Sequence, residues 1–171
     1  MTIPAGPSMP SDIVMMDALA LSRAIKSKQV SCVEVMNAYL DHIDALNPRV
    51  NAIVSLQDRD GLLRQAKARD EQLARGEHCG WMHGFPQAIK DLVATKGIRT
   101  TQGSRIFKDF VPAADAVVVE RMKRAGSIII GKTNTPEFGL GSNTYNDVFG
   151  RTLNSYDKTK TSGGSTEHQS R

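Results

Sequence analysis

A helix that leads directly into an entirely apolar strand limits the folds open to this chain. The helical spacing of Val117 and Val118 with the apolar residues after them predicts a helix over 114–125. A glycine ends that pattern, and the stretch Ser127–Ile130 then contains three consecutive isoleucines. β-branched residues favour a pleated strand, and a strand that is apolar on both sides is typical of a sheet covered on both faces. A second short strand is predicted at Gln87–Lys90, and strands that alternate with helices indicate an α/β fold.

A helical layer precedes these strands. Residues 17–28 are predicted to form a weakly amphipathic helix. The capping box Ser31-Cys-Val-Glu34 starts a second helix, because its hydroxyl and its carboxylate each satisfy a free backbone N–H group. Asn47-Pro48 is predicted to end that helix, since the residue before a proline disfavours helical geometry. Residues 51–56 are predicted to be short and β-like, and residues 59–75 to form a charged helix.

The charge distribution argues against a nucleic-acid-binding protein. The 171 residues contain 22 Lys and Arg against 18 Asp and Glu, which gives a formal charge of +4. Basic residues are mixed with acidic ones, as in Arg59-Asp60 and Arg69-Asp70-Glu71, instead of forming a basic stripe. Aromatic residues make up only 5% of the chain, so few rings are available to stack on bases. We therefore expect no nucleic-acid partner.

Other features of the sequence favour a cytoplasmic protein. The apolar runs are too short to cross a membrane, and the N-terminus lacks the apolar core of a secretory signal. No membrane partner is therefore expected. Cys32 and Cys79 form no C-x-x-C pair and accompany only four histidines. A zinc site or a disulfide framework is not expected, and two thiols fit a reducing compartment.

One motif suggests a nucleotide-binding protein. The stretch Gly126–Thr133 matches the phosphate-loop pattern G-x-x-x-x-G-K-[ST] letter for letter. A phosphate loop follows a strand and opens into a helix, whereas here a helix precedes the stretch and Pro136 follows soon after it. Three isoleucines also favour a sheet ladder over a loop wrapped around an anion. We interpret Lys132 as a structural or surface residue at a strand end, and nucleotide binding is the less favoured alternative.

The chain also carries a series of short motifs in a fixed order. They are His83-Gly-Phe-Pro86 with Ile89-Lys90-Asp91, Thr100-Thr-Gln-Gly-Ser104, Arg124-Ala-Gly-Ser-Ile-Ile-Ile-Gly-Lys-Thr-Asn134, Pro136-Glu-Phe138, Phe149-Gly-Arg-Thr-Leu-Asn154 and Thr161-Ser-Gly-Gly-Ser165. From about Asp17 onward, this series and the helices before it resemble the amidase signature family, the Ser-cisSer-Lys hydrolases of amide bonds. The resemblance implies an α/β fold in which helices flank a mixed sheet, behind an N-terminal helical layer. It also implies a small-molecule amide substrate and neither a metal nor an organic cofactor.

Lys90 is the candidate general base. A lysine can accept a proton only when it is neutral, which requires burial because desolvation disfavours the ammonium form. The residues alone favour an ion pair between Lys90 and Asp91 at the strand end, whereas the resemblance implies that Lys90 is the base. It further implies that Ser165 is the bridging serine, which is held by a cis peptide bond and relays a proton between Lys90 and the nucleophile. Gly139 is a candidate substrate-binding residue.

The end of the chain departs from the family pattern. The glycine-serine box would continue Ser-Gly-Gly, whereas residues 166–171 read Thr-Glu-His-Gln-Ser-Arg. In the family the nucleophilic serine lies further on, in a second glycine-serine stretch that also forms the oxyanion hole, and Ser170 is a poor match for it. We therefore expect a truncated chain with an incomplete sheet, which self-associates and has no amidase activity by itself. A non-catalytic interaction module, or a fragment that complements a second chain, is the alternative.

This interpretation divides the chain into three segments. Residues 1–11 contain Pro4, Pro7 and Pro10, and we interpret them as a flexible lead-in. Residues 12–154 are interpreted as the N-terminal portion of an amidase-like domain, and residues 155–171 as a polar tail that ends in the interrupted glycine-serine box. Within the domain, Thr135-Pro136-Glu137 predicts another helix start. The sequence leaves open whether the chain comes from a simple amidase or from the amidase component of a tRNA-dependent amidotransferase.

Overall fold

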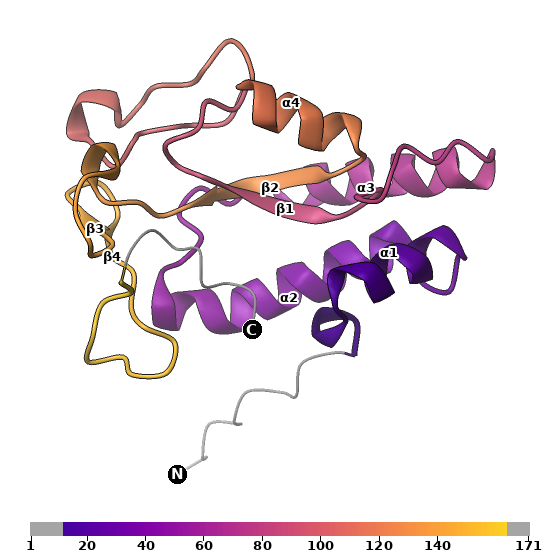
Figure 1. Cartoon of the computed structure of the whole chain (residues 1–171), viewed down its shortest axis with the longest axis horizontal. Coiled ribbons are helices and arrows are strands. Elements are labelled where there is room, and N and C mark those ends of the chain that lie inside the picture. The colour runs from indigo at the N-terminus through magenta and orange to yellow at the C-terminus, as the bar shows by residue number, and fades with distance from the viewer. Residues whose placement is uncertain (1–11, 164–171) are drawn as a thin grey trace.

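The computed structural model describes residues 12–163, in which two parallel strands lie between layers of helices (Figure 1). The predicted lead-in, residues 1–11, and the end of the predicted tail, residues 164–171, lie outside the described residues. None of the helices in the described part of the chain has the length and apolar character that a membrane crossing requires. The elements, in chain order, are η1 (Asp12–Met15), α1 (Ala18–Lys26), α2 (Cys32–Val50), α3 (Arg59–Ala74), β1 (Pro86–Lys90), η2 (Arg105–Phe107), α4 (Val117–Arg124), β2 (Ile128–Thr133), η3 (Glu137–Gly139), β3 (Tyr145–Asn146) and β4 (Gly150–Arg151).

The sheet is built on β1 and β2. These strands pair in parallel, and their register places Lys90 opposite Thr133. On the other edge of β2, Ile53 forms an antiparallel bridge with Thr133, and the Gln57 N–H donates to the carbonyl oxygen of Ile130 (2.8 Å). Both predicted strands are confirmed, although β2 runs further than predicted and the β-like segment contributes only one bridge. β2 therefore pairs in parallel with β1 and antiparallel with the segment around Ile53, which makes the sheet mixed. The prediction of an α/β fold is confirmed.

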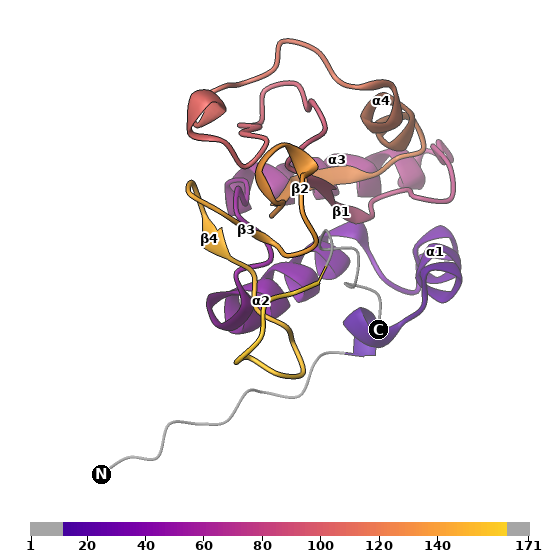
Figure 2. The same cartoon turned by 60° about the vertical axis from the view of Figure 1, so that its left-hand side comes forward.

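The isoleucine run of β2 supplies two separate core clusters. Ile128 and Ile130 pack with residues of α1, α2 and α3, whereas Ile129 packs with Val119 of α4. Successive side chains of a strand point to opposite faces, so one run of isoleucines serves both layers. Figure 2 shows α4 on one side of β2 and α1 and α2 on the other. The prediction of a strand covered on both faces is confirmed, since every residue of β2 is buried.

Helix α2 begins as predicted and ends later than predicted. Ser31 caps the helix and forms the capping box with Glu34. At the other end the helix continues through Pro48 for two more residues, so the predicted end at Asn47-Pro48 is wrong. The proline lies in the last turn, where it removes only one donor from the helix. Asn51 then closes the helix in a left-handed conformation (φ 55°), and its N–H donates to the carbonyl oxygen of Asn47 (2.7 Å).

Two other expectations are corrected by the structure. The spacing that predicted α4 did not identify its buried residue, because Val117 and Val118 are 62% and 50% exposed and Val119 is the buried valine. A helix of only two turns reaches the strands along a narrow stripe, and Val119 lies on that stripe. The helix predicted from Thr135 is a single 3-10 turn, η3. Phe138 has a left-handed φ of 52° within that turn, and a right-handed helix cannot continue through such a residue.

Candidate active site

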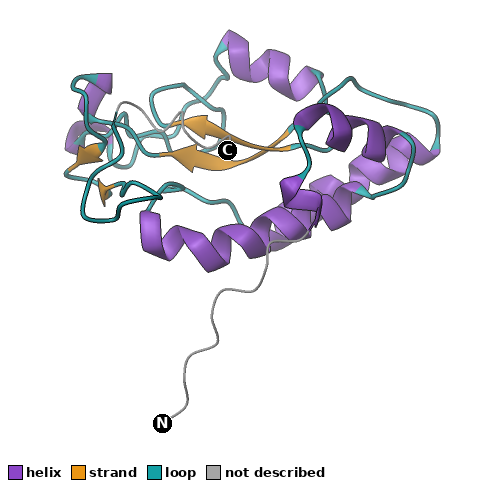
Figure 3. Ribbon diagram, turned by 60° about the horizontal axis from the view of Figure 1, so that its bottom comes forward, coloured by secondary structure: helices purple, strands orange, loops and turns teal. Residues whose placement is uncertain are grey.

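Lys90 is the last residue of β1 and pairs with Thr133, the last residue of β2. The two strands lie side by side as the long orange arrows in Figure 3. In open α/β sheets, ligands bind outside the carboxyl ends of the parallel strands. The Lys90 side chain is half-buried, and within residues 12–163 its ammonium group takes part in no hydrogen bond or ion pair. The expected ion pair with Asp91 is therefore absent from the described residues. Lys90 thus lies at the carboxyl ends of the parallel strands, and no carboxylate of this part of the chain pairs with it.

Asp91, the next residue, is fully buried and is bound by Thr101. The Thr101 N–H lies 3.1 Å from each carboxylate oxygen, and the Thr101 hydroxyl donates to Oδ2 (2.5 Å). Burial raises the pKa of Asp91, and the hydrogen bonds from Thr101 and the nearby Lys132 oppose that rise. Asp91 thus anchors the loop after β1 to the strand end, which explains why it does not pair with Lys90.

Lys132 is also fully buried, and it is not part of a phosphate loop. Its Nζ donates to the carbonyl oxygen of Val93 (2.5 Å) and to the hydroxyl of Thr95 (2.9 Å). Burial lowers the pKa of Lys132 from 10.5 to about 8, against the attraction of Asp91 and Asp115. Because the residues before it form a buried strand, their N–H groups do not surround an anion. Of the two predicted roles, structural or surface, Lys132 has the structural one.

His83, from the first motif of the series, has a structural environment. The N–H of Cys79 donates to Nδ1 (3.2 Å), and Nε2 lies 2.9 Å from the carbonyl oxygen of Arg69, so two backbone groups hold the buried ring in place. Cys79 is exposed, whereas Cys32 is buried, and burial together with Asp70 raises the pKa of the Cys32 thiol to about 12. No group of three or more His, Cys, Asp or Glu in the described part of the chain is arranged to hold a metal ion.

Two buried asparagines beyond the strand ends were missed by the sequence analysis. Asn146 Nδ2 donates to Oδ1 of Asn134 (2.7 Å) and to the carbonyl oxygen of Thr135 (2.8 Å). Its Oδ1 accepts hydrogen bonds from the N–H groups of Val148 (2.9 Å) and Phe149 (2.8 Å). Asn134 ends one of the quoted motifs, but nothing in that motif indicates its bonds, and no periodicity or motif singles out Asn146. The bonds of the two asparagines to each other and to Thr135 and Thr152 span 11 to 18 residues, which no local pattern records. The two residues, Asn134 and Asn146, define the asparagine hub.

The asparagine hub is connected to the start of the glycine-serine box. Asn134 Nδ2 donates to the hydroxyl of Thr152 (3.0 Å). The N–H of Ser162 donates to the carbonyl oxygen of Thr152 (2.9 Å), and the N–H of Thr144 donates to the carbonyl oxygen of Ser162 (3.1 Å). Gly163 is the last described residue. Ser165, the predicted bridging serine, lies outside the described residues.

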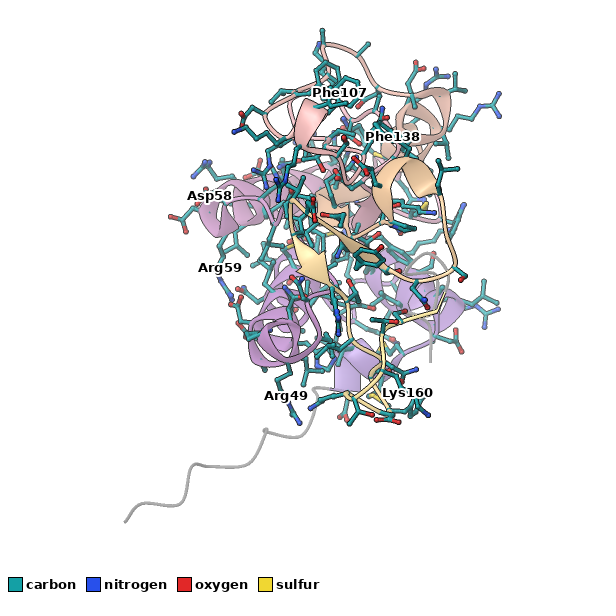
Figure 4. All side chains as sticks on the ribbon, turned by 90° about the vertical axis from the view of Figure 1, so that its left-hand side faces the viewer. Arg49, Asp58, Arg59, Phe107, Phe138 and Lys160 are labelled. Atoms are coloured by element: carbon teal, nitrogen blue, oxygen red, sulfur yellow. The ribbon has the colours of Figure 1, made fainter. Side chains whose placement is uncertain are left out.

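Gly139 lies in η3, at the same end of the strands. It is exposed and has a φ of 74°, a conformation that favours glycine. A Cβ added at Gly139 would lie 2.8 Å from Cδ1 of Leu92, so this turn packs against the loop that follows Lys90. Its neighbour Phe138 stacks edge-on with Phe107, with 6.2 Å between ring centroids (Figure 4). The turn therefore borders the loop after the candidate base, and contact of Gly139 with a substrate stays a prediction.

Comparison with known proteins identifies the family. The Amidase family matches residues 34–166. A glutamyl-tRNA(Gln) amidotransferase subunit from Acidothermus cellulolyticus is 43% identical over 155 residues, which cover 91% of this chain and 30% of the relative. The corresponding protein of Streptomyces coelicolor is also 43% identical, with 91% of this chain and 31% of the relative covered.

Solved structures show the same relationship. A bacterial aryl acylamidase of the amidase signature family is 32% identical with a TM-score of 0.82, covering 88% of this chain and 31% of that structure. Fatty acid amide hydrolase is 25% identical with a TM-score of 0.85, covering 90% and 27%. This chain thus spans about a third of the length of the relatives it matches. From the family match and these relatives, we conclude that the chain belongs to the amidase signature family and corresponds to the N-terminal portion of its members.

Proposed function

We propose that this chain supplies the general base, Lys90, and the bridging serine, Ser165, of a site that hydrolyses a carboxamide C–N bond. The environment of Lys90 is the observation that carries the proposal. It is half-buried at the carboxyl end of β1, and no carboxylate of the described residues pairs with it. The role of Ser165 rests on the resemblance of residues 161–165 to the glycine-serine box of the family.

In the proposed reaction, neutral Lys90 accepts the proton of the Ser165 hydroxyl while Ser165 accepts the proton of a nucleophilic serine. The oxygen of that serine forms a bond to the carboxamide carbon. The C–N bond breaks as the proton returns through Ser165 to the leaving amine. Water then attacks the ester by the same proton route, which releases the carboxylic acid and restores the serine.

The 171-residue chain by itself is proposed to be inactive. The second glycine-serine stretch, which carries the nucleophile and the oxyanion hole in the family, does not occur among its residues. Oxyanion stabilisation is commonly the largest catalytic contribution, so its loss removes most of the rate enhancement. We propose that residues outside these 171, tested below as a separate complementing chain, supply both features, and that the site acts in the cytoplasm.

A second, narrower proposal is that the site serves a multi-chain amidotransferase. Among the relatives of this chain are proteins named as subunits of glutamyl-tRNA(Gln) amidotransferase. Another similar structure comes from a vestigial protein complex that bears on the origins of an s-triazine catabolic enzyme, with 34% identity and a TM-score of 0.81. Because these relatives come from multi-chain proteins, both similarities support a site that works within a larger assembly.

Complementation tests the proposed function. The purified chain is mixed with the C-terminal remainder of the Acidothermus cellulolyticus relative, and ammonia release from simple primary amides is measured. We expect no release from either part alone and measurable release from the mixture. Lys90→Ala should abolish it, whereas Lys96→Ala, an exposed lysine in the following loop, should leave it unchanged. Release that survives Lys90→Ala contradicts the role of the base, and a mixture without activity contradicts complementation.

A further inference from the structure

Three short segments meet beyond the carboxyl ends of β1 and β2, at the end of the molecule that carries β3 and β4 (Figure 1). They are residues 143–146, 150–153 and 159–163. The N–H of Thr144 donates to the carbonyl oxygen of Ser162 (3.1 Å), and the N–H of Ser162 donates to the carbonyl oxygen of Thr152 (2.9 Å). The N–H of Thr152 donates to the carbonyl oxygen of Thr144 (3.0 Å) and closes the backbone triangle. Each segment is therefore bound to the other two.

The backbone triangle has a buried inner side and an exposed outer side. Thr144 and Thr152 are 0% and 3% exposed, and Asn146 of the asparagine hub is 5% exposed. Successive side chains of an extended segment point to opposite sides, so the residues between these positions point outward. They are Tyr145 and Arg151, which are exposed and face each other in the antiparallel register of β3 and β4. The outer side thus carries a guanidinium group directly across from an aromatic residue.

A hollow of about 570 Å³ opens on this outer side, and its volume lies within the range of small-molecule sites. Its lining combines two cationic side chains with neutral polar ones from all three segments, and it contains no carboxylate. The lining residues are Asn143, Tyr145, Arg151, Thr159, Lys160 and Thr161. The chemistry of this hollow therefore suits a negatively charged ligand.

Both cations are available to such a ligand. The guanidinium of Arg151 takes part in no hydrogen bond or ion pair within residues 12–163. Lys160 Nζ lies 3.2 Å from Oδ2 of Asp157, but the two side chains are 74% and 44% exposed. Such an exposed pair contributes little, and an ammonium group has two further donors. Oδ1 of Asp157 accepts hydrogen bonds from the N–H (3.1 Å) and the hydroxyl (2.6 Å) of Thr159, which anchor this carboxylate to its own loop.

We propose that Arg151 and Lys160 bind a small dianion, whose two charges are carried by a phosphate group or by two carboxylates. A guanidinium presents a planar fork that matches two oxygens of either group, and the ammonium neutralises the second charge. Asn143 and Thr161 supply neutral donors to the remaining oxygens. The inference does not depend on the proposed function, because the binding is measured without cleavage of an amide.

Equilibrium dialysis tests the site in the full 171-residue chain. Radiolabelled inorganic phosphate and radiolabelled succinate are tested separately at pH 8, in a chloride buffer of low ionic strength. We expect saturable binding of at least one of these anions. Acetate, which carries a single charge, should displace the label several-fold less effectively than the unlabelled dianion does.

Variants then locate the binding. Arg151→Gln should weaken it by about five- to tenfold, and Lys160→Gln by about threefold. Arg64→Gln removes the same charge from an exposed position of α3 and should leave the affinity within about twofold of the parent. The comparison of Arg151→Gln with Arg64→Gln separates a local site from a general effect of net charge. Circular dichroism of each variant establishes that the compared proteins are folded.

The two anions distinguish the sources of the charge. Binding of phosphate alone identifies a phosphate ligand and binding of succinate alone a dicarboxylate, and each supports the site if Arg151→Gln weakens it. The proposal is overturned if neither anion binds saturably, or if Arg151→Gln and Arg64→Gln lose equal affinity. Displacement by acetate that matches displacement by the unlabelled dianion contradicts the recognition of two charges. If Arg151→Gln is not folded, Lys160→Gln takes its place, and an unchanged affinity in that variant overturns the proposal.

Discussion

Lys90 and Lys132 lie on paired strands, but the fold places them in opposite environments. Lys132 is opposite Ile89 in the register, and paired residues share a face of the sheet. Ile89 belongs to the core cluster beneath α4, so Lys132 enters that layer, whereas the next position along β1, Lys90, points to the other face. One lysine is enclosed by carbonyl and hydroxyl oxygens, and the other keeps its amine free of bonds within the described chain.

Replacement of Lys132 should therefore destabilise the protein far more than replacement of Lys90. Lys132→Met leaves the carbonyl oxygen of Val93 and the hydroxyl of Thr95 without their donor, and it removes the cation near buried Asp91. The free energy of unfolding should fall by about 3–5 kcal/mol. Lys90→Met, the matched control, should change it by no more than about 0.5 kcal/mol. Urea denaturation followed by circular dichroism compares the two, and equal losses would contradict this prediction.

The titration of Lys132 should be visible in the pH dependence of stability. Its pKa is about 8 in the folded chain against 10.5 ordinarily. Between these values the unfolded state keeps a proton that the folded state has lost, so the free energy of unfolding rises with pH. Relative to Lys132→Met, the wild-type protein should gain about 1–3 kcal/mol from pH 7.5 to pH 10.5. A constant difference across this range would show that Lys132 titrates normally.

At the scale of residues, the sequence predicted where side chains lie in the strands better than it predicted their hydrogen-bond partners. The strand end at Lys90 followed from the short apolar run before it, and the structure confirms that position. The bonds of Asp91 with Thr101 and of Lys132 with Thr95 depend on how a loop returns to the strands, which no local pattern records. Asn146 was missed for the same reason.

At the scale of elements, α2 and α3 are joined through a carboxylate at a helix N-terminus. Asp70 of α3 accepts hydrogen bonds from the N–H groups of Cys32 (2.6 Å) and Val33 (3.1 Å). The first N–H groups of a helix have no partner within the helix, and negative charge is favourable there. The two longest helices of the described chain are thus joined by polar bonds as well as by their apolar faces.

Removal of this carboxylate should weaken the helical layer. Asp70→Ala leaves two N–H groups at the start of α2 without their acceptor, and the free energy of unfolding should fall by about 2 kcal/mol. Glu71→Ala changes an exposed neighbour on the same helix and should alter it by no more than about 0.5 kcal/mol. Thermal or urea denaturation of both variants checks the difference. If both variants had similar free energies of unfolding, water would bind the two N–H groups as favourably as Asp70 does, and the prediction would be wrong.

The helices and the main strands were predictable because their signals are local. A capping box and helical spacing lie within one segment, and three consecutive isoleucines identify a buried strand without knowledge of its partner. β3 and β4 were not predicted, since two residues cannot show a period. The end of α2 was predicted too early, because the prediction relied on Pro48 alone. The helix continues past this proline and ends where Asn51 adopts a left-handed conformation.

At the scale of the whole molecule, the sheet has one edge without a partner in the described chain. β2 lies between β1 and the segment around Ile53, whereas β1 pairs only with β2 within residues 12–163. An edge strand of this kind exposes N–H and C=O groups to other chains. Because net stabilities are only about 5–15 kcal/mol, the contacts missing at such an edge matter.

We expect the isolated chain to self-associate through this edge. Light scattering should show oligomers or aggregates, and a dye for apolar surfaces should bind. Gln87→Lys places a charge on the edge strand and should reduce association, whereas Val117→Lys, on the exposed face of α4, should not. A monodisperse monomer that unfolds in one sharp thermal transition and binds no dye would contradict self-association through this edge.

The packing of the helical layer against β2 also fixes an order of events during translation. Synthesis proceeds from the N-terminus, so α1, α2 and α3 leave the ribosome before Ile128 and Ile130 have been added. Until then, Met36 and Leu62 of their shared core cluster lack the strand that covers them in the finished chain. The newborn helices thus expose apolar side chains that other proteins can bind, and the addition of the isoleucine run allows β2 to cover them.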